Sequence, residues 1–331
     1  MKRLMFKGVL ALATVSALGL VQAQEKSIKF AVQNPKGHPI VTGVEKFAEI
    51  VNSKAAGKLK VNIYAGGALG SDFQVISAMQ GGTVEMGVMN SSITAGTVKE
   101  MAVYDFPFLF RSEKEADAIV DGPFGKKMHA KLEEKGMVGL SYFELGFRNL
   151  TNGKRPLNKV EDIAGLKLRV IPTAINVDWV TALGANPTPL PFPEVYGALE
   201  QKAIDGQENP YTVIHANKLY EVQKHLAITN HQYNPQSVII SKKFWDRLSA
   251  DEKKILQDAA NEAAKFQRVV SRKEMSVALE GLKKAGMEVT EFSPAEIAKF
   301  TEKMKPVYEK HGAALGSTYK ELTDELAKLR K

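Results

Sequence analysis

The segment Gly165-Leu166-Lys167-Leu168-Arg169-Val170-Ile171-Pro172 predicts a short strand that ends at a proline. Its side chains alternate, so Leu166, Leu168 and Val170 share one face and Arg169 lies on the other. A strand buried on both faces is usually apolar, so an arginine in it needs a partner. Ligands bind at the carboxyl ends of such strands, and a guanidinium matches a carboxylate with two parallel hydrogen bonds. Arg169 is therefore a candidate for holding an anionic small molecule; the alternative is an ion pair with a neighbouring Asp or Glu.

The composition is that of a globular protein. The chain has 331 residues, 44% hydrophobic and 25% charged, with a formal net charge of +8. This length predicts about two domains. The sequence contains no cysteine, which excludes disulfides, thiolate metal sites and a cysteine nucleophile. Its six histidines show no metal-ligand spacing. We therefore expect neither a metal nor a cofactor.

The first 23 residues predict a secretory signal peptide. Lys2, Arg3 and Lys7 form a charged start, residues 8–21 are apolar but too short for a comfortable membrane span, and Ala23 suits cleavage. The mature chain then carries +8 − 3 = +5, spread along its length, which is not the footprint of a nucleic-acid-binding protein. These features predict a periplasmic protein that does not insert into the membrane; a retained anchor is the alternative.

The pattern that follows is typical of an α/β protein. Alternating segments at 27–32, 58–64 and 84–89 predict strands, and helices beginning near 38 and 71 lie between them. This rhythm favours a mostly parallel sheet with helices on its faces. A second unit follows the strand at 165–172, with a helix at 173–183 and an extended proline-spaced segment at 187–193. Further strands are predicted at 138–143 and 237–241.

A long helix closes the pattern. Ser249 and Glu252 form a capping box, and the helical periodicity continues to about Ala285. At ~1.5 Å per residue this helix is on the order of 50 Å long, enough to cross two domains. We therefore predict domain I at 24–146 plus 235–274, and domain II at 147–234 plus 275–331, with a ligand cleft between them.

Motifs of enzymatic chemistry are absent from the sequence. It contains no G-x-S-x-G, no H-E-x-x-H, no phosphate-binding lysine loop and no G-x-G-x-x-G. No nucleophile is placed beside a base along the chain. These observations argue against an enzyme, although catalytic groups can also meet only in the folded protein.

Several segments together resemble the DctP-type substrate-binding proteins of tripartite ATP-independent periplasmic (TRAP) transporters. They occur in the order and spacing of that family and span essentially the whole mature chain. The segments are Leu69-Gly70-Ser71-Asp72, Phe147-Arg148-Asn149-Leu150-Thr151-Asn152, Gly165 to Pro172, Pro191-Phe192-Pro193-Glu194-Val195-Tyr196-Gly197-Ala198-Leu199-Glu200, Asp205-Gly206-Gln207-Glu208-Asn209-Pro210 and Tyr220-Glu221-Val222-Gln223-Lys224.

The resemblance implies a fold and a set of ligand-binding residues. The fold is a two-domain periplasmic-binding-protein fold with a hinge and a long domain-spanning helix, which agrees with the pattern above. By position, Arg169 matches the arginine that clamps a carboxylate, and Arg148 a second arginine near the ligand. The other matched positions are Asn209, which orients the carboxylate, Phe192, which packs on the ligand, and Asp72 and Asn90, which contact its remainder.

Each matched residue also has a purely structural interpretation. Arg148 could pair with Glu144 or another acid, and Asn209 could be a turn residue. The remaining alternatives are a core position for Phe192, a helix N-terminus for Asp72 and a strand-end cap for Asn90. In the family the segment at 32–38 faces the cleft, so Lys36 or His38 could read a second polar end of the ligand.

The resemblance therefore predicts a periplasmic solute-binding protein that captures an organic-acid anion and delivers it to a TRAP membrane permease. The position of Asn90 is acidic in the branch that binds sialic acid, so the neutral amide argues against that ligand. Hydroxy or keto acids, aromatic acids, dicarboxylates and sugar acids remain open. We expect a monomer without enzymatic activity. The alternatives are a periplasmic ligand sensor and an enzyme acting on a small carboxylate.

Overall fold

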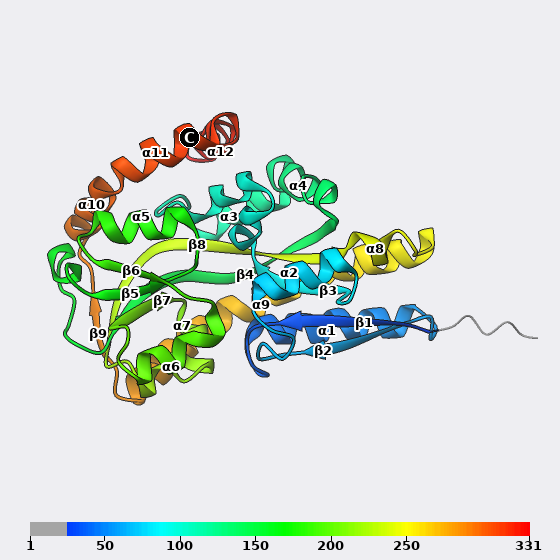
Figure 1. The fold of residues 1–331 in the computed structure, drawn as a ribbon, viewed down its shortest axis with the longest axis horizontal. Coiled ribbons are helices and arrows are strands. Elements are labelled where there is room, and N and C mark those ends of the chain that lie inside the picture. The colour runs from blue at the N-terminus through cyan, green and yellow to red at the C-terminus, as the bar shows by residue number, and fades with distance from the viewer. Residues whose placement is uncertain (1–24) are drawn as a thin grey trace, which may run out of the picture.

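The computed structural model describes residues 25–331, and the predicted signal peptide at 1–23 lies outside this range. The described residues form one nine-stranded mixed sheet flanked by helices (Figure 1). Its strand order is β2-β1-β3-β8-β4-β7-β5-β6, and β9 pairs with β8. The strands are β1 (Lys26–Val32), β2 (Leu59–Tyr64), β3 (Met86–Asn90), β4 (Met137–Asn152), β5 (Lys167–Val170), β6 (Asn186–Pro189), β7 (Gly206–Asn209), β8 (His225–Ser241) and β9 (Glu288–Glu291). The predicted α/β class is confirmed.

Each end of the sheet is a small parallel unit. In the first half β1 pairs in parallel with β2 and β3, and in the second half β5 pairs in parallel with β6 and β7. Parallel neighbours need crossover connections, and here these connections contain helices. They are α1 (Pro39–Lys54) and α2 (Asp72–Gly81) in the first half, and α5 (Ala174–Ala182) and α6 (Val195–Glu200) in the second.

Two long antiparallel strands, β4 and β8, join the halves (Figure 1). The sequence predicts only their segments at 138–143 and 237–241, because Glu144, Arg148 and Asn234 interrupt the apolar pattern. These polar residues are buried all the same. The pairing shifts register between Glu144 and Phe147, where Gly146 adopts a left-handed φ of 106°. L side chains rarely adopt this φ, so the strand crosses between the halves at a position that favours glycine.

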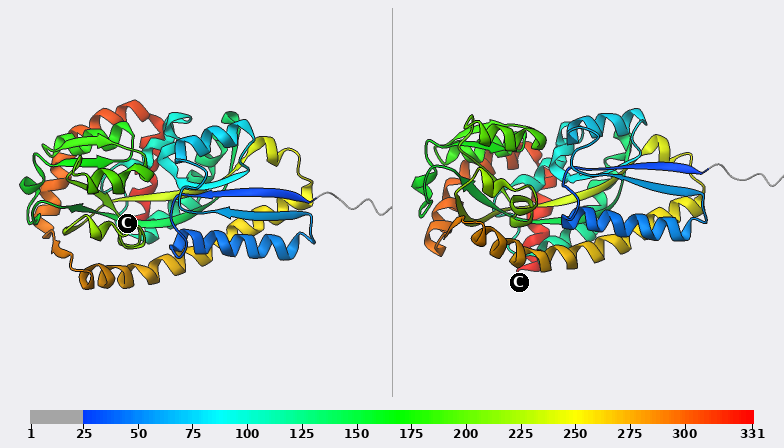
Figure 2. Two further views of the ribbon diagram at one scale, coloured as in Figure 1. Left: turned by 60° about the horizontal axis from the view of Figure 1, so that its bottom comes forward. Right: turned by 90° about the horizontal axis from the view of Figure 1, so that it is seen from below.

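Helix α9 (Ala250–Lys284) confirms the predicted long helix with its 35 residues. It packs on α1, on β4 and on α7 (Tyr211–Ala216), so it contacts both halves (Figure 2). Both hydrogen bonds of the predicted Ser249–Glu252 capping box are present. Further along, the Gln267 side chain accepts from the backbone N–H of Glu144 at 2.8 Å and donates to its carbonyl at 2.7 Å. The helix is thus fastened to β4 where that strand crosses.

The apolar core differs between the two faces of the sheet. The remaining helices are α3 (Glu113–Asp121), α4 (Pro123–Ala130), α8 (Lys242–Trp245), α10 (Pro294–Lys303), α11 (Lys305–Leu315) and α12 (Ser317–Leu329). On one face a single cluster draws residues from both halves, and α2, α3, α4, α5, α10, α11 and α12 contribute to it, whereas Phe244 of α8 belongs to the other face. On the other face the core is divided, with one cluster under α1 and the first part of α9 and another under α6 and the end of α9.

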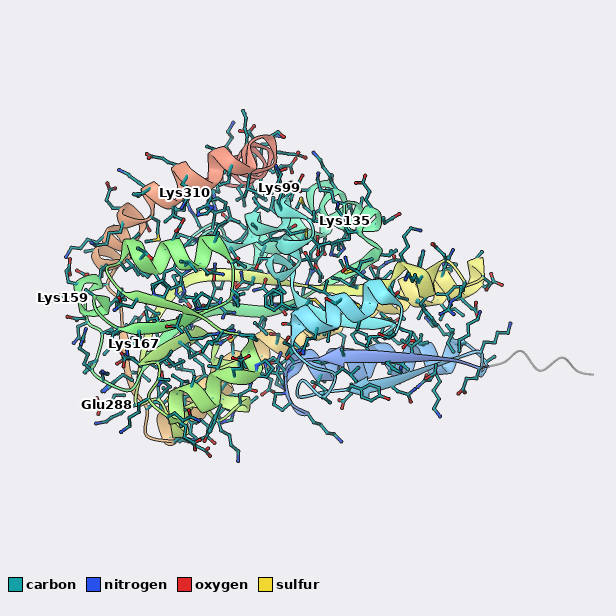
Figure 3. The ribbon with its side chains drawn as sticks, viewed as in Figure 1. Lys99, Lys135, Lys159, Lys167, Glu288 and Lys310 are labelled. Carbon is teal, nitrogen blue, oxygen red and sulfur yellow. The ribbon has the colours of Figure 1, made fainter. Side chains whose placement is uncertain are left out.

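Surface charge is distributed over many elements. The lysines labelled in Figure 3 lie around the periphery and come from separate parts of the chain. Across residues 25–331, no helix combines the length and the hydrophobicity needed to traverse a bilayer.

Candidate ligand-binding site

One cavity between the two halves collects most of the residues that the sequence nominates. It contains about 550 Å³ of empty space, including its mouth. His38 does not line it, and six predicted residues do: Asp72, Asn90, Arg148, Arg169, Phe192 and Asn209. The structure therefore brings these six side chains together from both halves, and their role in binding stays a prediction.

The sheet explains why residues so distant in sequence meet here. Asn90 ends β3, Asn209 ends β7 and Arg169 is the penultimate residue of β5. Asp72 begins α2, which follows β2. Carboxyl ends of parallel strands are where open α/β sheets bind ligands. The two parallel units direct these ends toward the same space, and Arg148 of β4 lies between them.

Among the described residues, Arg169 is a buried cation without a carboxylate partner. It is only 2% exposed, and its Nε and Nη2 donate to the carbonyl of Leu190 at 2.9 and 2.7 Å. Within residues 25–331 no ion pair includes it, so the alternative of pairing with a neighbouring acid does not hold. Burial lowers the pKa of Arg169 to about 10, which keeps it charged at neutral pH. Its remaining donors can bind a carboxylate in the cavity.

Arg148 is equally buried, but its charge is neutralised inside the protein. Its Nη2 donates to Glu208 Oε1 at 2.8 Å and to the Glu208 carbonyl at 2.7 Å, and its Nε binds Oε2. The partner is therefore Glu208; Glu144 binds Arg272 instead, at 2.6 Å. Burial alone would raise the pKa of Glu208, but Arg148 and His231 hold it at about 2. The Arg148–Glu208 pair is thus ionised at neutral pH.

The first-half wall presents amides with unused hydrogen-bonding atoms. Asn90 Oδ1 accepts from the N–H and hydroxyl of Ser92 at 3.1 and 3.0 Å, so the predicted strand-end cap is present. Its Nδ2 is buried and has no partner among the described residues. Gln33 Nε2 donates to the Gly70 carbonyl at 2.8 Å, whereas its buried Oε1 also lacks a partner there. An unsatisfied buried polar group costs about 1–3 kcal/mol, which a ligand hydroxyl would relieve because it both donates and accepts.

Asp72 gives the same wall an acidic group. It is half-buried as the first residue of α2. Burial raises its pKa to about 7, against the opposing effects of the nearby Gln33 amide and the charge of Arg169. The carboxyl is therefore partly protonated at neutral pH. No group of three or more potential metal ligands occurs in the described part of the chain.

The second-half wall combines an amide with an aromatic ring. Asn209 is paired with Asn149 in the sheet and donates from Nδ2 to Gln207 at 2.6 Å, so it belongs to a strand end. Phe192 is half-buried, and its ring centroid lies 5.9 Å from Arg169 Cζ. This distance is that of a cation–π contact. The ring therefore packs beside the unpaired guanidinium.

His38 is not among the residues that line the cavity, so the structure does not bring it together with the other nominated side chains. It is 1% exposed, and its Nδ1 accepts from the N–H of Ile40 at 3.1 Å to cap α1. Burial lowers its pKa to about 3, so the ring is neutral. A histidine before a proline at the start of a helix is compatible with a helix cap and with a ligand-binding residue, and the sequence alone could not separate these two roles.

Sequence reasoning missed several cavity residues. Gln33 and Asn34 follow β1 directly, inside the segment that the resemblance places at the cleft, but the prediction favoured the more distinctive His38. Gln236 lies on β8, whose polar part was not predicted as strand. Glu208 stands beside Asn209 in a quoted motif, yet only the structure shows it opposite Arg148.

Comparison with known proteins gives consistent matches over most of the chain. Residues 30–314 match the DctP family, described as bacterial extracellular solute-binding protein family 7. The chain is 35% identical to the 2,3-diketo-L-gulonate-binding periplasmic protein YiaO of Escherichia coli, covering 85% of each chain. A crystal structure of the sugar acid binding protein DctPAm from Advenella mimigardefordensis with galactonate is 41% identical, with a TM-score of 0.90 over 92% of this chain and 98% of that one. A TRAP periplasmic solute-binding protein from Ochrobactrum anthropi, with a C-terminus bound in its pocket, is 51% identical, with a TM-score of 0.83 over 93% and 97% of the two chains.

Proposed function

The chain belongs to the DctP family of bacterial extracellular solute-binding proteins, and from this premise we propose that its ligand is a hydroxylated monocarboxylate, a sugar acid. Proteins of this family capture organic acids and deliver them to TRAP permeases. The function predicted from the sequence is therefore shown at the level of the family. The class of ligand is inferred from the chemistry of the cavity.

The observation that carries the proposal is the unpaired Arg169. A buried arginine that donates only to a backbone carbonyl leaves its charge uncompensated. A ligand carboxylate would supply both the opposite charge and two acceptor atoms. Asn209 lies in the same wall and can add an amide to that carboxylate.

The opposite wall favours hydroxyl groups over a second carboxylate. Asn90 Nδ2 and Gln33 Oε1 offer one free donor and one free acceptor, which suit hydroxyls. A second carboxylate would need another cation, but Arg148 is already neutralised by Glu208. It would also meet Asp72, and two like charges at close range repel each other. A dicarboxylate is therefore the poorer fit.

Relatives support this ligand class. The Advenella protein is a sugar acid binding protein whose crystal structure contains galactonate, and the Escherichia protein is named for 2,3-diketo-L-gulonate. Both ligands are six-carbon acids with one carboxylate and several oxygen substituents. The chemistry of the cavity points to the same class.

Closure would follow from the way the cavity is shared. We propose that 24–146 with 235–274 and 147–234 with 275–331 move as two domains about the crossings of β4, β8 and α9. A ligand bridging both walls makes all its contacts only when the halves are together, so it shifts the population toward the closed form. The protein would act as a monomer in the periplasm after loss of residues 1–23, would catalyse no reaction, and would pass its ligand to the permease.

The test is calorimetric titration of the mature protein with galactonate, gluconate and succinate, repeated with Arg169→Ala. We expect the two sugar acids to bind, succinate to bind at least about tenfold more weakly, and the variant to bind the sugar acids about 100-fold more weakly than wild type. Tight binding of succinate alone would contradict the ligand class. Undiminished binding by Arg169→Ala would contradict the carboxylate clamp.

A further inference from the structure

A second hollow adjoins the ligand cavity at the outer edge of the cleft. It contains about 690 Å³ of empty space, open to solvent, and lies between the loops of the first half and the segment after β6. The two spaces share two lining residues, Gln33 from the first half and Phe192 from the second. One side chain from each half therefore stands between the cavity and the hollow.

Gln33 is held in this position by its surroundings. Its Nε2 donates to the Gly70 carbonyl, and its neighbours Val32 and Asn34 accept backbone hydrogen bonds from Gly67 and Gly66 at 3.0 and 2.9 Å. Gly67 has a left-handed φ of 71°, and a Cβ there would lie only 3.2 Å from Gln33 Oε1. The glycine thus leaves room for the amide, which fills the gap between the loops.

Phe192, the other residue that lines both the cavity and the hollow, has a different role from Gln33. Phe192 packs on the guanidinium of Arg169, so it belongs to the carboxylate end of the site as well. Gln33 has no such link to Arg169 or Arg148 among the hydrogen bonds and ion pairs of residues 25–331. Of the two residues between the cavity and the hollow, Gln33 is therefore the one that can be substituted without removing a contact of the anion-binding arginine.

The hollow suits a neutral hydroxylated ring. None of the described residues that line it is charged. Pro193 and Tyr196 offer flat apolar faces, and the Tyr196 hydroxyl is held by Glu221 at 2.8 Å. The amide of Asn217 adds a polar group, its Nδ2 donating to the Val213 carbonyl at 2.9 Å. Ring C–H faces pack on aromatic and proline surfaces, while hydroxyls pair with amides.

We propose that Gln33 sets the length of the ligand. It closes the cavity over a single sugar acid, and without it the hollow becomes a subsite for a neutral sugar ring joined to the distal carbon of that acid. This inference rests on the proposed function, because it presupposes a sugar acid anchored at Arg169. The role of Gln33 in ligand selection follows from its position between the cavity and the hollow, and not from its unpaired Oε1.

The test compares gluconate with melibionate, in which a neutral galactose is joined to the terminal carbon of gluconate. Affinities are measured by calorimetry for the wild-type mature protein, Gln33→Ala and Asn34→Ala. Asn34 is the matched control, because it lines the cavity but not the hollow. We expect wild type and Asn34→Ala to prefer gluconate by at least about 100-fold, and Gln33→Ala to reduce this preference by about tenfold or more.

Two further measurements keep the outcomes distinct. Adding Tyr196→Ala to Gln33→Ala should remove the gain for melibionate and leave gluconate unchanged, because Tyr196 lines only the hollow. If Gln33→Ala fails to fold by circular dichroism, Gln33→Ser takes its place. An unchanged preference in the folded variant overturns the role of Gln33 alone. Failure of folded wild type to bind any sugar acid overturns the proposed function and this inference together.

Discussion

Arg148 and Arg169 are two arginines of the same cavity with nearly equal burial and opposite surroundings. Arg148 is 1% exposed and forms a two-pronged ion pair with Glu208, whereas Arg169 is 2% exposed and donates, within residues 25–331, only to the Leu190 carbonyl. His231 adds a third member to the first group, with Nε2 3.6 Å from Glu208 Oε2. One arginine is thus compensated before any ligand arrives, and the other is not.

The difference suggests that the two arginines have different roles, one in the stability of the fold and the other in ligand binding. A buried ion pair is costly to break because the surviving charge is left without a partner. Arg148 and Glu208 therefore fix the position where β4 and β7 meet. A buried cation without a counter-ion instead weakens the empty state and gains from a ligand. We expect substitutions at the first arginine to affect folding and those at the second to affect binding.

The largest expected effect is on stability, from Arg148→Ala. The change leaves the Glu208 carboxylate buried without its cation, so the free energy of unfolding should fall by about 3–5 kcal/mol. Urea denaturation at pH 7 measures it. The double variant Arg148→Met with Glu208→Leu should recover much of the loss, since no charge is then left unpaired. A single variant as stable as wild type would show that the ion pair does not support the fold.

The next effect is on binding, from Arg169→Ala. Galactonate affinity should fall about 100-fold, or ~2.7 kcal/mol, because the carboxylate loses its charged donors. The midpoint of urea unfolding without ligand should change little, since no carboxylate loses a partner. Arg155→Ala is the matched control: its guanidinium also donates to backbone carbonyls, those of Asp162 and Ala164, but lies outside the cavity. Equal losses of affinity in both variants would erase the distinction between the two arginines.

The sequence predicted Arg169 better than it predicted the contrast with Arg148. An arginine near the end of an apolar strand is visible as a pattern, and so is the helix start at Ser249. Glu208 is 60 positions from Arg148, and nothing in either segment tells which acid will face it. The pairing depends on β4 and β7 being neighbours, which is a property of the whole sheet.

The same reason limited the prediction of the fold. The parallel units follow from local alternation, but the crossing parts of β4 and β8 carry buried polar residues that look like loop. Glu144 can be buried there because Arg272, Tyr233 and Gln267 satisfy it from distant parts of the chain. Local pattern cannot anticipate partners that only the tertiary structure supplies.

A smaller effect concerns the acid opposite Arg169. Asp72→Asn should improve succinate affinity by about tenfold while galactonate changes less, because the variant removes a charge that repels a second carboxylate. Calorimetry with both ligands measures the ratio. Ser71→Ala, at the neighbouring cap of α2, controls for a change in the helix start. An unchanged ratio would mean that Arg148 and Glu208, not Asp72, exclude dicarboxylates.

The same variant should change how stability depends on pH. The folded-state pKa of Asp72 is raised to about 7 from the ordinary value of 3.8, so between these values the folded protein binds more protons than the unfolded chain. This group's contribution is therefore fully present below about pH 4 and is lost as pH rises through 7. Half-exposure reduces its size. Urea unfolding at pH 5 and pH 8 should show a smaller fall for Asp72→Asn than for wild type, and identical falls would contradict the shifted pKa.

The smallest expected effect is on binding, from the aromatic ring of Phe192, which packs beside Arg169. Phe192 lies 5.9 Å from Arg169 Cζ, and among the described residues no ring stands over Arg148 in this way. Phe192→Leu should weaken galactonate binding by about threefold, ~0.6 kcal/mol, because leucine keeps apolar contact but not the cation–π attraction. A double-mutant cycle with Arg169→Lys separates that attraction from simple packing. Additive losses of binding free energy would mean that the ring acts on the ligand independently of Arg169. Coupled losses would mean that the ring positions the Arg169 guanidinium for the ligand carboxylate. Arg148 is instead positioned by Glu208, and that contact supports the fold.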